Sequence, residues 1–263
     1  MKTLRVALGI EYDGTGFHGW QAQTPDVATV QACMTAAVSR VANHPVILHC
    51  AGRTDTGVHA LCQVAHFDTS ADRSDRAWVL GGNANLPPGV NLLWARSVTG
   101  DFHARFSAVA RHYRYGILNR SVRSGLDRHR WVWVHHPLDA ERMQAAGQFL
   151  VGEQDFSSYR ALSCQARSPI RTIHYLRVIR QGNRVILSIG ANGFLHHMVR
   201  NIAGVLIAIG QGDYPPEWAA ELLTYRDRTQ GDVTAAPWGL YFAGVDYPEG
   251  LGLAGLSTCS EWP

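Results

Sequence analysis

The sequence contains almost no lysine and no long run of apolar residues. Lys2 is the only lysine among 24 lysine and arginine residues, so nearly all positive charge is carried by guanidinium groups. A guanidinium binds phosphate through paired hydrogen bonds and stacks on nucleic-acid bases, although a compositional bias of the source organism explains the same excess. No apolar run approaches about 18 residues, so we expect no membrane-spanning helix. The first residues lack the features of a signal peptide, which predicts a cytoplasmic protein.

Cysteine is scarce and scattered along the chain. There are 5 cysteines, an odd number, and none of them is paired in a CxxC motif. This pattern argues against a disulfide framework and against a zinc site. The sequence also lacks a P-loop, a GxGxxG fingerprint and an HExxH motif. We therefore expect no cofactor and no bound metal.

Acidic residues are nearly absent from one stretch of the chain. Between residues 105 and 130 the only acid is Asp127. The arginines of the same stretch are Arg105, Arg111, Arg114, Arg120, Arg123, Arg128 and Arg130. A basic strip on a chain whose net charge is only +3 indicates a surface that binds a polyanion.

The apolar residues follow the periods of strands and helices. Alternating residues predict a half-buried strand over 4–12, and helical spacing after Thr29, a good N-cap, predicts a helix. Further strands are predicted at 46–50, 63–67, 90–97, 113–118, 131–134, 170–179, 184–189 and 242–247. Further helices are predicted from Asp75 to Gly82, from Asp139, over 195–209 and after Pro215.

The order of these elements predicts the fold. Strand, helix, strand, strand, helix and strand follow one another in the first half, which is a ferredoxin-like unit, and a similar order recurs. We predict an α/β (α+β) protein of two ferredoxin-like β-α-β-β-α-β halves with a largely antiparallel sheet. The predicted domains are 1–105 and 106–263, and a cleft between them is a natural place for an active site.

One loop between two predicted strands combines turn residues with reactive ones. Residues 51–60 contain two glycines, and Arg53 stands two positions before Asp55. The simplest interpretation of Asp55 is a turn residue that accepts hydrogen bonds from nearby amides. A second is the Asp-Thr-Gly of an aspartic protease, with Asp68 as partner. We reject it because a predicted strand separates the two carboxylates, whereas a protease dyad shares one proton.

The whole loop supports a third interpretation. Its Gly-Arg-Thr-Asp-x-Gly-Val-His pattern closely resembles the catalytic loop of the tRNA pseudouridine synthase A family. Residues 12–21 and the segment Phe-His-Ala-Arg-Phe-x-Ala…Arg-x-Tyr-x-Tyr at 102–115 are also similar to that family. The resemblance extends from about Ile10 to Pro248, and the tail from 249 has no counterpart in it.

The resemblance implies roles for four residues. Asp55 is the catalytic aspartate, a nucleophile or a base, and Arg53 is its companion in the loop. Tyr113 stacks on the target base. Arg200 resembles the family arginine that pairs with the catalytic aspartate, and such a pair would keep Asp55 ionised and oriented. The residues themselves leave open whether the aspartate attacks the sugar or the base, or removes a proton from the sugar.

Two adjacent histidines suggest a metal site at first sight. His196 and His197 lie at the start of the predicted helix over 195–209. Neighbouring side chains diverge on a helix, and HExxH spacing is absent. We therefore predict a position on the helix surface for both histidines and no metal.

The resemblance also implies the reaction and its partner. It predicts an isomerase that converts uridine to pseudouridine at positions 38, 39 and 40 of the anticodon stem-loop of tRNA. The target nucleotide must be flipped, because a base within a stem is out of reach. The family further implies a homodimer in which one tRNA contacts both chains. The residues expected to bind the substrate are Tyr113, Arg105, Arg111, Arg114, Arg123 and Arg128.

Two other functions remain open from the residues. The first is a non-catalytic RNA-binding protein on the same scaffold, which would tolerate loss of Asp55. The second is a hydrolase that uses Asp55, although no second carboxylate is placed to assist it.

Overall fold

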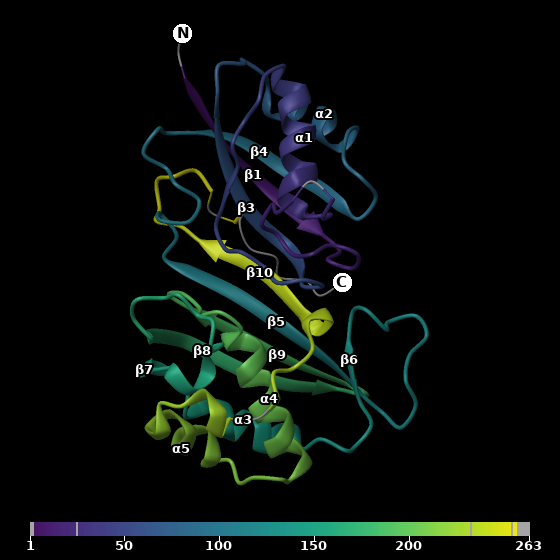
Figure 1. Ribbon diagram of the computed structural model, residues 1–263, viewed down its shortest axis with the longest axis vertical. Coiled ribbons are helices and arrows are strands. Elements are labelled where there is room, and N and C mark those ends of the chain that lie inside the picture. Colours follow the sequence, from purple (N-terminus) through teal and green to yellow (C-terminus); the bar gives the residue numbers. More distant parts are fainter. Residues whose placement is uncertain (1–2, 25, 232, 254, 257–263) are drawn as a thin grey trace. The chain divides into compact units, whose positions relative to one another are not determined.

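The structure is a computed structural model that describes residues 3–24, 26–231, 233–253 and 255–256 (Figure 1). The chain forms two compact units, the first from Met1–Arg111 with Tyr241–Pro263 and the second from His112–Leu240. The predicted domain division between 105 and 106 stays a prediction, because compact units need not be independent domains. The last part of the unmatched tail, 257–263, lies outside the described residues. None of the helices in the described ranges has the length and apolar character needed to cross a bilayer.

The first unit is a sheet with two helices. Its elements are β1 (Leu4–Tyr12), α1 (Val30–Ala42), β2 (His49–Cys50), β3 (His59–Thr69), α2 (Asp75–Asn83), β4 (Val90–Val98) and β10 (Leu240–Asp246). The strands follow the order β4-β1-β3-β10, and β2 pairs with β3. Strand β1 runs antiparallel to both neighbours, whereas β10 pairs in parallel with β3. The closing strand therefore completes a sheet that began more than two hundred residues earlier.

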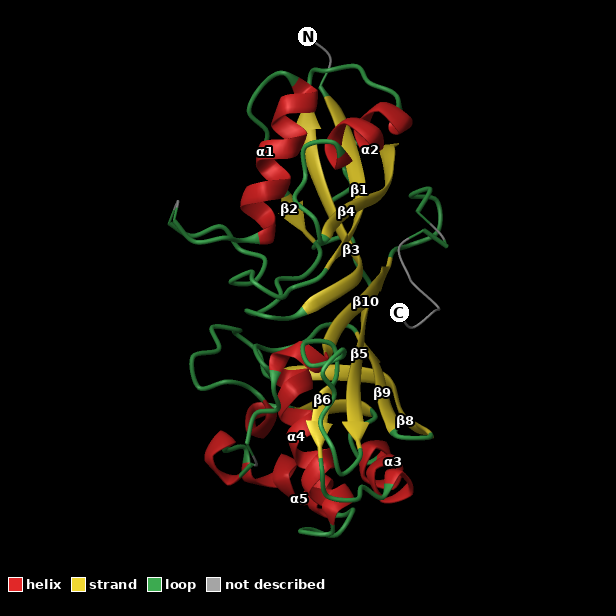
Figure 2. Cartoon of the chain, turned by 90° about the vertical axis from the view of Figure 1, so that its right-hand side faces the viewer, coloured by secondary structure: helices red, strands yellow, loops and turns green. Residues whose placement is uncertain are grey.

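Strand β1 is buried on both faces, so its predicted half-buried state is wrong. Figure 2 shows α1 and α2 on one side of β1, β3 and β4. On β1 itself, a Cβ added to Gly9 would lie 2.1 Å from the Trp94 indole, so this ring packs directly on the strand. The Trp94 indole nitrogen donates to the Leu256 carbonyl (2.7 Å), and Leu253 is buried. The C-terminal segment thus supplies a cover that strand periodicity cannot reveal.

The helix boundaries of this unit follow from their caps. The Thr29 hydroxyl accepts from the Ala32 amide (3.4 Å), which confirms Thr29 as the N-cap of α1. Helix α2 begins at Asp75 as predicted, and its N-cap is Ser74 rather than Asp75, because the Ser74 hydroxyl accepts from the Ala77 amide (3.2 Å). Asp75 instead lies in the first turn, where its carboxylate pairs with Arg96 (2.9 Å).

The second unit combines a sheet with three helices. Its elements are β5 (Ala110–Asn119), β6 (Val132–Val134), α3 (Ala140–Gln148), β7 (Gly152–Asp155), β8 (Ile170–Gln181), β9 (Arg184–Ala191), α4 (Met198–Gln211) and α5 (Trp218–Tyr225). The order is β5-β9-β8-β7, with β6 parallel to β5. The β7–β8 and β8–β9 pairs are antiparallel. The predicted α/β (α+β) class with largely antiparallel pairing is confirmed.

Some boundaries of the second unit differ from the prediction. Helix α4 begins at Met198 rather than at 195, because His197 adopts a left-handed backbone (φ 60°) that cannot continue a helix. Strand β7 was not predicted, since its residues Gly-Glu-Gln-Asp show no apolar alternation. It forms through its pairing with β8.

A buried histidine links the sheet of the first unit to the loop after β4. His66 on β3 is only 2% exposed, and its Nδ1 accepts from the Ala104 amide (3.2 Å). Burial lowers the pKa of His66 to about 4, and His103, Arg5 and His49 act in the same direction. The imidazole is therefore neutral in the folded protein at neutral pH.

This burial predicts a pH dependence of stability. The unfolded chain binds a proton at His66 below pH ~6.5, whereas the folded chain binds it only near pH 4. The free energy of unfolding should therefore fall as the pH drops between these values, by about 3 kcal/mol at most, since one pKa unit corresponds to about 1.4 kcal/mol. The change His66→Asn keeps an acceptor for the Ala104 amide but does not titrate, so it should flatten this dependence. Denaturant unfolding at several pH values measures the effect, and His18→Asn, at an exposed site, is the control. An equal slope in both variants would contradict the assignment.

Candidate active site

The loop that carries Asp55 is bonded to β3 at its start and runs into β3 at its end. At its start, the Ala51 amide donates to the Val64 carbonyl (2.8 Å), and the Gln63 side-chain amide donates to the Gly52 carbonyl (2.6 Å). At its end, the Val58 amide donates to the carbonyl of Asp55 (3.1 Å). The start of the loop is therefore held by β3, and a turn at Asp55 leads directly into the same strand.

The centre of the loop is anchored through Thr54. Its side chain is buried, and its hydroxyl lies 2.8 Å from the Tyr12 hydroxyl. The Trp20 amide donates to the Thr54 carbonyl (3.0 Å). Gly19 has φ +81°, and a Cβ added there would lie 2.5 Å from that carbonyl. Only glycine permits both this backbone conformation and this close approach.

Tyr12 and Trp20 lie beneath the loop rather than at its surface. Tyr12 and Trp20 are 2% and 1% exposed, so their aromatic rings support the loop by packing. Burial raises the pKa of Tyr12 well above its usual value, which keeps its hydroxyl protonated. Residues on either side of Thr54 are more open: Asp55 is half-buried and Arg53 is exposed. The loop therefore presents a carboxylate and a guanidinium while its middle residue faces the core.

Sequence reasoning missed the role of Gln63. This residue is fully buried on β3 and exchanges hydrogen bonds with the Gly52 backbone. A glutamine at the start of a predicted strand, between Cys62 and Val64, was the available signal, because an amide that becomes buried needs partners. The partner could be found only from the structure.

Arg111 connects a second loop to the start of the Asp55 loop. Its guanidinium donates to the carbonyls of Ala51 (3.4 Å), Ala108 (3.1 Å) and Arg105. It is half-buried, whereas Arg105 is exposed. In the first unit, Arg111 therefore holds residues 105–108 against the residue that precedes Gly52.

The second unit positions Tyr113 and Arg200. Tyr113 on β5 is 9% exposed, and the Phe194 ring meets it edge to face at 5.0 Å between centroids. Arg200 lies in the first turn of α4 and donates from Nε to the Ala235 carbonyl (2.8 Å). The Ala235 amide returns a bond to the Arg200 carbonyl (3.1 Å). Both side chains are thus held by their own unit, and Arg114 is half-buried.

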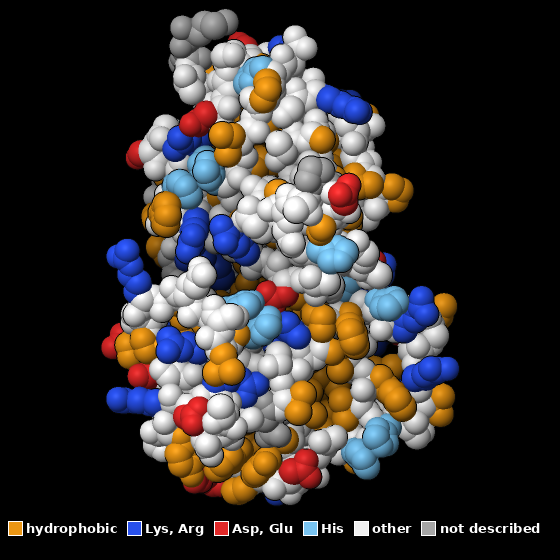
Figure 3. All heavy atoms as spheres, viewed as in Figure 1, with side chains coloured by type: hydrophobic (Ala, Val, Ile, Leu, Met, Phe, Trp, Pro, Cys, Tyr) orange, Lys and Arg blue, Asp and Glu red, His pale blue; other side chains and the backbone are white. Residues whose placement is uncertain are grey.

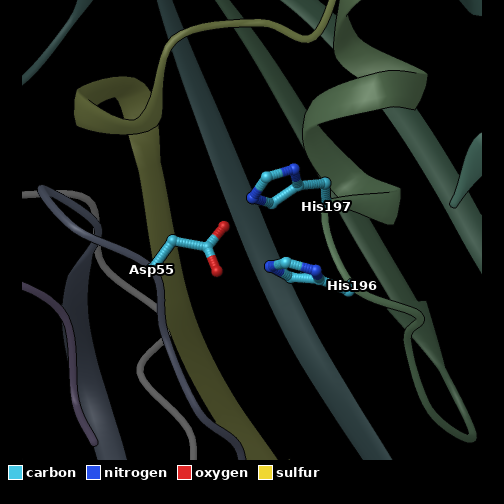
Figure 4. A group of neighbouring side chains, drawn as sticks. All are labelled: Asp55, His196 and His197. Atoms are coloured by element: carbon cyan, nitrogen blue, oxygen red, sulfur yellow. The ribbon is translucent and has the colours of Figure 1, made fainter. Parts of the chain in front are cut away.

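The two histidines precede α4 instead of lying on it. Figure 4 shows Asp55 on its loop and His196 and His197 directly before the first turn of α4. The predicted placement of the pair on the helix surface is wrong, because the left-handed backbone of His197 delays the helix. Their ring centroids are 4.0 Å apart, so the two side chains do not diverge.

The remaining predicted arginines lie on the loop between β5 and β6. Arg123 and Arg128 are exposed there. The loop has a defined shape, because Arg120 donates to the carbonyls of Val122 (2.7 Å) and Arg123 (3.2 Å). Figure 1 shows this segment as a long excursion from the sheet of the second unit. The loop therefore exposes the guanidinium groups of Arg123 and Arg128 to solvent.

Known proteins resemble this chain over most of its length. A sequence model of the family described as tRNA pseudouridine synthase matches residues 9–107 and 146–248, together more than half of the chain. A protein of Methylococcus capsulatus named tRNA pseudouridine synthase A is 59% identical over 251 residues, which cover 95% of this chain and 92% of that protein. The Nitrosococcus oceani protein of the same name is 58% identical over 254 residues, covering 97% and 98%. A Coxiella burnetii protein of that name is 54% identical over 244 residues, covering 93% of each.

The close approach at Gly19 can be tested with a matched control. Gly16 also has a positive φ (+85°), but a Cβ added there would meet no atom within 4 Å. Gly16→Ala and Gly19→Ala should therefore share the backbone strain of about 1 kcal/mol. Only Gly19→Ala should displace Thr54 and weaken the bond from the Trp20 amide.

Hydrogen exchange measured at the Trp20 amide distinguishes the two variants. We expect faster exchange in Gly19→Ala alone. Equal protection in both variants would show that the loop accommodates a side chain at residue 19.

Proposed function

The chain belongs to the tRNA pseudouridine synthase A family, and from this membership we propose that it forms pseudouridine at positions 38, 39 and 40 in the anticodon stem-loop of tRNA. It is an isomerase. The observation that carries the proposal is the Asp55 loop, in which a half-buried carboxylate next to an exposed Arg53 is fixed through Thr54. A residue that served only as a turn would not need this anchoring.

The reaction exchanges one bond for another. The bond from C1′ of the ribose to N1 of uracil breaks, the base turns, and a bond forms from C1′ to C5. The proton on C5 leaves, and N1 takes one up, so no electrons are gained or lost. Such a reaction needs a group that acts on the sugar or the base and a site that retains the detached uracil.

Each predicted residue fits one of these requirements. Asp55 acts as the nucleophile or as a base toward the sugar. Tyr113, whose ring is steadied by Phe194, stacks on the uracil and keeps it in place while it turns. Arg200, oriented by the Ala235 carbonyl, pairs with Asp55 and keeps it ionised. Arg53 positions the target nucleotide or fills the gap that it leaves in the stem.

The arginines of the basic strip hold the RNA. Arg105, Arg123 and Arg128 are exposed and bind phosphates. Arg114 and Arg111 also bind the substrate, and Arg111 orders residues 105–108. We also infer a homodimer in which one tRNA contacts both chains, a cytoplasmic location, and functional domains at 1–105 and 106–263.

Asp55→Asn should abolish isomerisation and leave tRNA binding nearly unchanged, because the amide is isosteric but is neither a nucleophile nor a base. Release of tritium from tRNA labelled at C5 of uridine measures turnover, and filter binding measures affinity. Asp72→Asn removes the same charge from an exposed position of the first unit and should behave as wild type. Substantial turnover by Asp55→Asn would remove this residue from the mechanism, and wild-type binding without turnover would favour the non-catalytic alternative.

Binding should weaken steeply with salt, since each bound phosphate releases counterions. The double variant Arg123→Gln, Arg128→Gln should show a smaller slope of log affinity against log salt concentration, by about one unit for each lost phosphate contact. The matched control replaces Arg73 and Arg76, which are also exposed but lie outside the strip. Equal slopes in the two double variants would place the phosphate contacts elsewhere.

A further inference from the structure

We propose that Phe106, together with His103 and Arg105, forms a platform on which an unpaired base of the RNA stacks beside the Asp55 loop. The inference rests on the proposed function, since it assigns a subsite for the same substrate. These three residues are called the Phe106 platform below. They lie in the loop between β4 and β5, within the first unit.

Phe106 is an apolar ring that the protein leaves in water. Its side chain is 75% exposed, although burying a phenylalanine side chain would stabilise the folded protein. The His103 ring lies 4.3 Å from it between centroids, tilted by 34°, and the Arg105 guanidinium lies 5.6 Å from its centroid. These contacts steady the ring and leave most of its surface available to a ligand.

A single exposed phenylalanine is ordinary on a mobile loop, but this one is held. The amides of Arg105 (3.1 Å) and Phe106 (3.3 Å) both donate to Nδ1 of His103. Ser107 closes the turn, since its amide donates to the His103 carbonyl and its hydroxyl accepts from the His103 amide, both at 2.9 Å. Binding to an ordered ring loses less conformational entropy, so the platform is preorganised.

The platform stands on other rings that reach into the core. The His103 ring lies 4.5 Å from that of the buried His66 and 5.5 Å from that of the exposed His49. His66 in turn meets the buried Phe102 edge to face at 5.8 Å. The Phe106 platform is therefore supported by side chains of the buried core.

The His103 ring is neutral and can donate one hydrogen bond to the ligand. Its Nδ1 accepts two amides, so the ring proton lies on Nε2 and points away from the loop backbone. Partial burial lowers the pKa of His103, and His49, Arg5 and Arg105 lower it further. At neutral pH the ring therefore offers one N–H to an oxygen of the ligand.

The positive charge around the platform favours a nucleic acid over an uncharged apolar ligand. Arg105 is exposed beside the ring, and both Arg105 and Arg53 are close enough to act on the Cys50 thiol, whose pKa burial raises to about 12. The neighbouring carboxylate of Asp68 is neutralised by Arg5 through two bonds of 2.7 Å. Figure 3 shows histidine side chains next to arginine side chains on the part of the surface that belongs to the first unit. An aromatic ring with a guanidinium beside it is a common way for proteins to bind unpaired nucleotides.

The same loop is tied to the catalytic loop. Arg111 donates to the carbonyls of Arg105 and Ala51, four residues before Asp55. A base on Phe106 is thereby placed at a fixed position relative to Arg53 and Asp55 in the first unit. Bases within a stem are already stacked, so the ligand is a nucleotide of the loop that is unpaired in the free RNA.

The test uses a stem-loop RNA with 2-aminopurine at each unpaired loop position in turn, because stacking on an aromatic ring quenches its fluorescence. Phe106→Leu keeps an apolar side chain without the ring, and Phe106→Trp retains a ring. Phe149→Leu makes the same change at another exposed phenylalanine, in the second unit. Thermal unfolding checks that each variant is folded. We expect all of them to fold, because both substituted positions are exposed.

We expect quenching at one loop position in the wild type and in Phe106→Trp, and loss of this quenching in Phe106→Leu. The dissociation constant and KM of Phe106→Leu should rise about 10-fold, as loss of one base–aromatic stack implies, with no change in Phe149→Leu. Unchanged quenching and affinity in Phe106→Leu, with normal pseudouridine formation, would overturn the platform while the proposed function stands. Absence of both binding and turnover in the wild type would instead overturn the proposed function, and the platform with it.

Discussion

The anchoring of Thr54 is the contact on which the rest of the site depends. Its buried hydroxyl meets Tyr12, and its carbonyl accepts from the Trp20 amide. A catalytic carboxylate acts efficiently only when its backbone is already placed, because freedom in the loop would have to be lost again in the transition state. The sheet of the first unit, the buried rings beneath the loop and the glycine at residue 19 all serve this placement of Asp55.

Backbone carbonyls orient several of the arginines. Arg111 donates to three carbonyls at the Asp55 loop and the Phe106 loop. Arg200 is aimed by the Ala235 carbonyl, and Arg120 shapes the loop that carries Arg123. A carbonyl orients a guanidinium without changing its charge. Oriented guanidinium groups suit a protein that binds RNA, because they bind phosphates through paired hydrogen bonds.

The sequence predicted the local elements better than their partners. Periodicity found most strands and helices, and the Thr29 cap followed from local chemistry. Long-range contacts decided what was missed: the parallel pairing of β10 with β3, the cover that Trp94 and the C-terminal segment provide for β1, and strand β7. Asp55 was predicted as catalytic because its whole loop is a specific motif, and this role stays a prediction. Gln63 was not found, since its role depends on which backbone groups come to lie beside it.

The central claim is that this chain forms pseudouridine in the anticodon stem-loop, and nucleotide-resolution mapping of pseudouridine tests it most directly. Unmodified tRNA transcripts with uridines at positions 38, 39 and 40 and elsewhere would be incubated with the purified protein. Each pseudouridine would then be located by chemical modification and reverse transcription. The account predicts pseudouridine at those three positions and at no other uridine. Pseudouridine in a different arm of the tRNA, or none at all with a folded protein that binds the transcript, would contradict it.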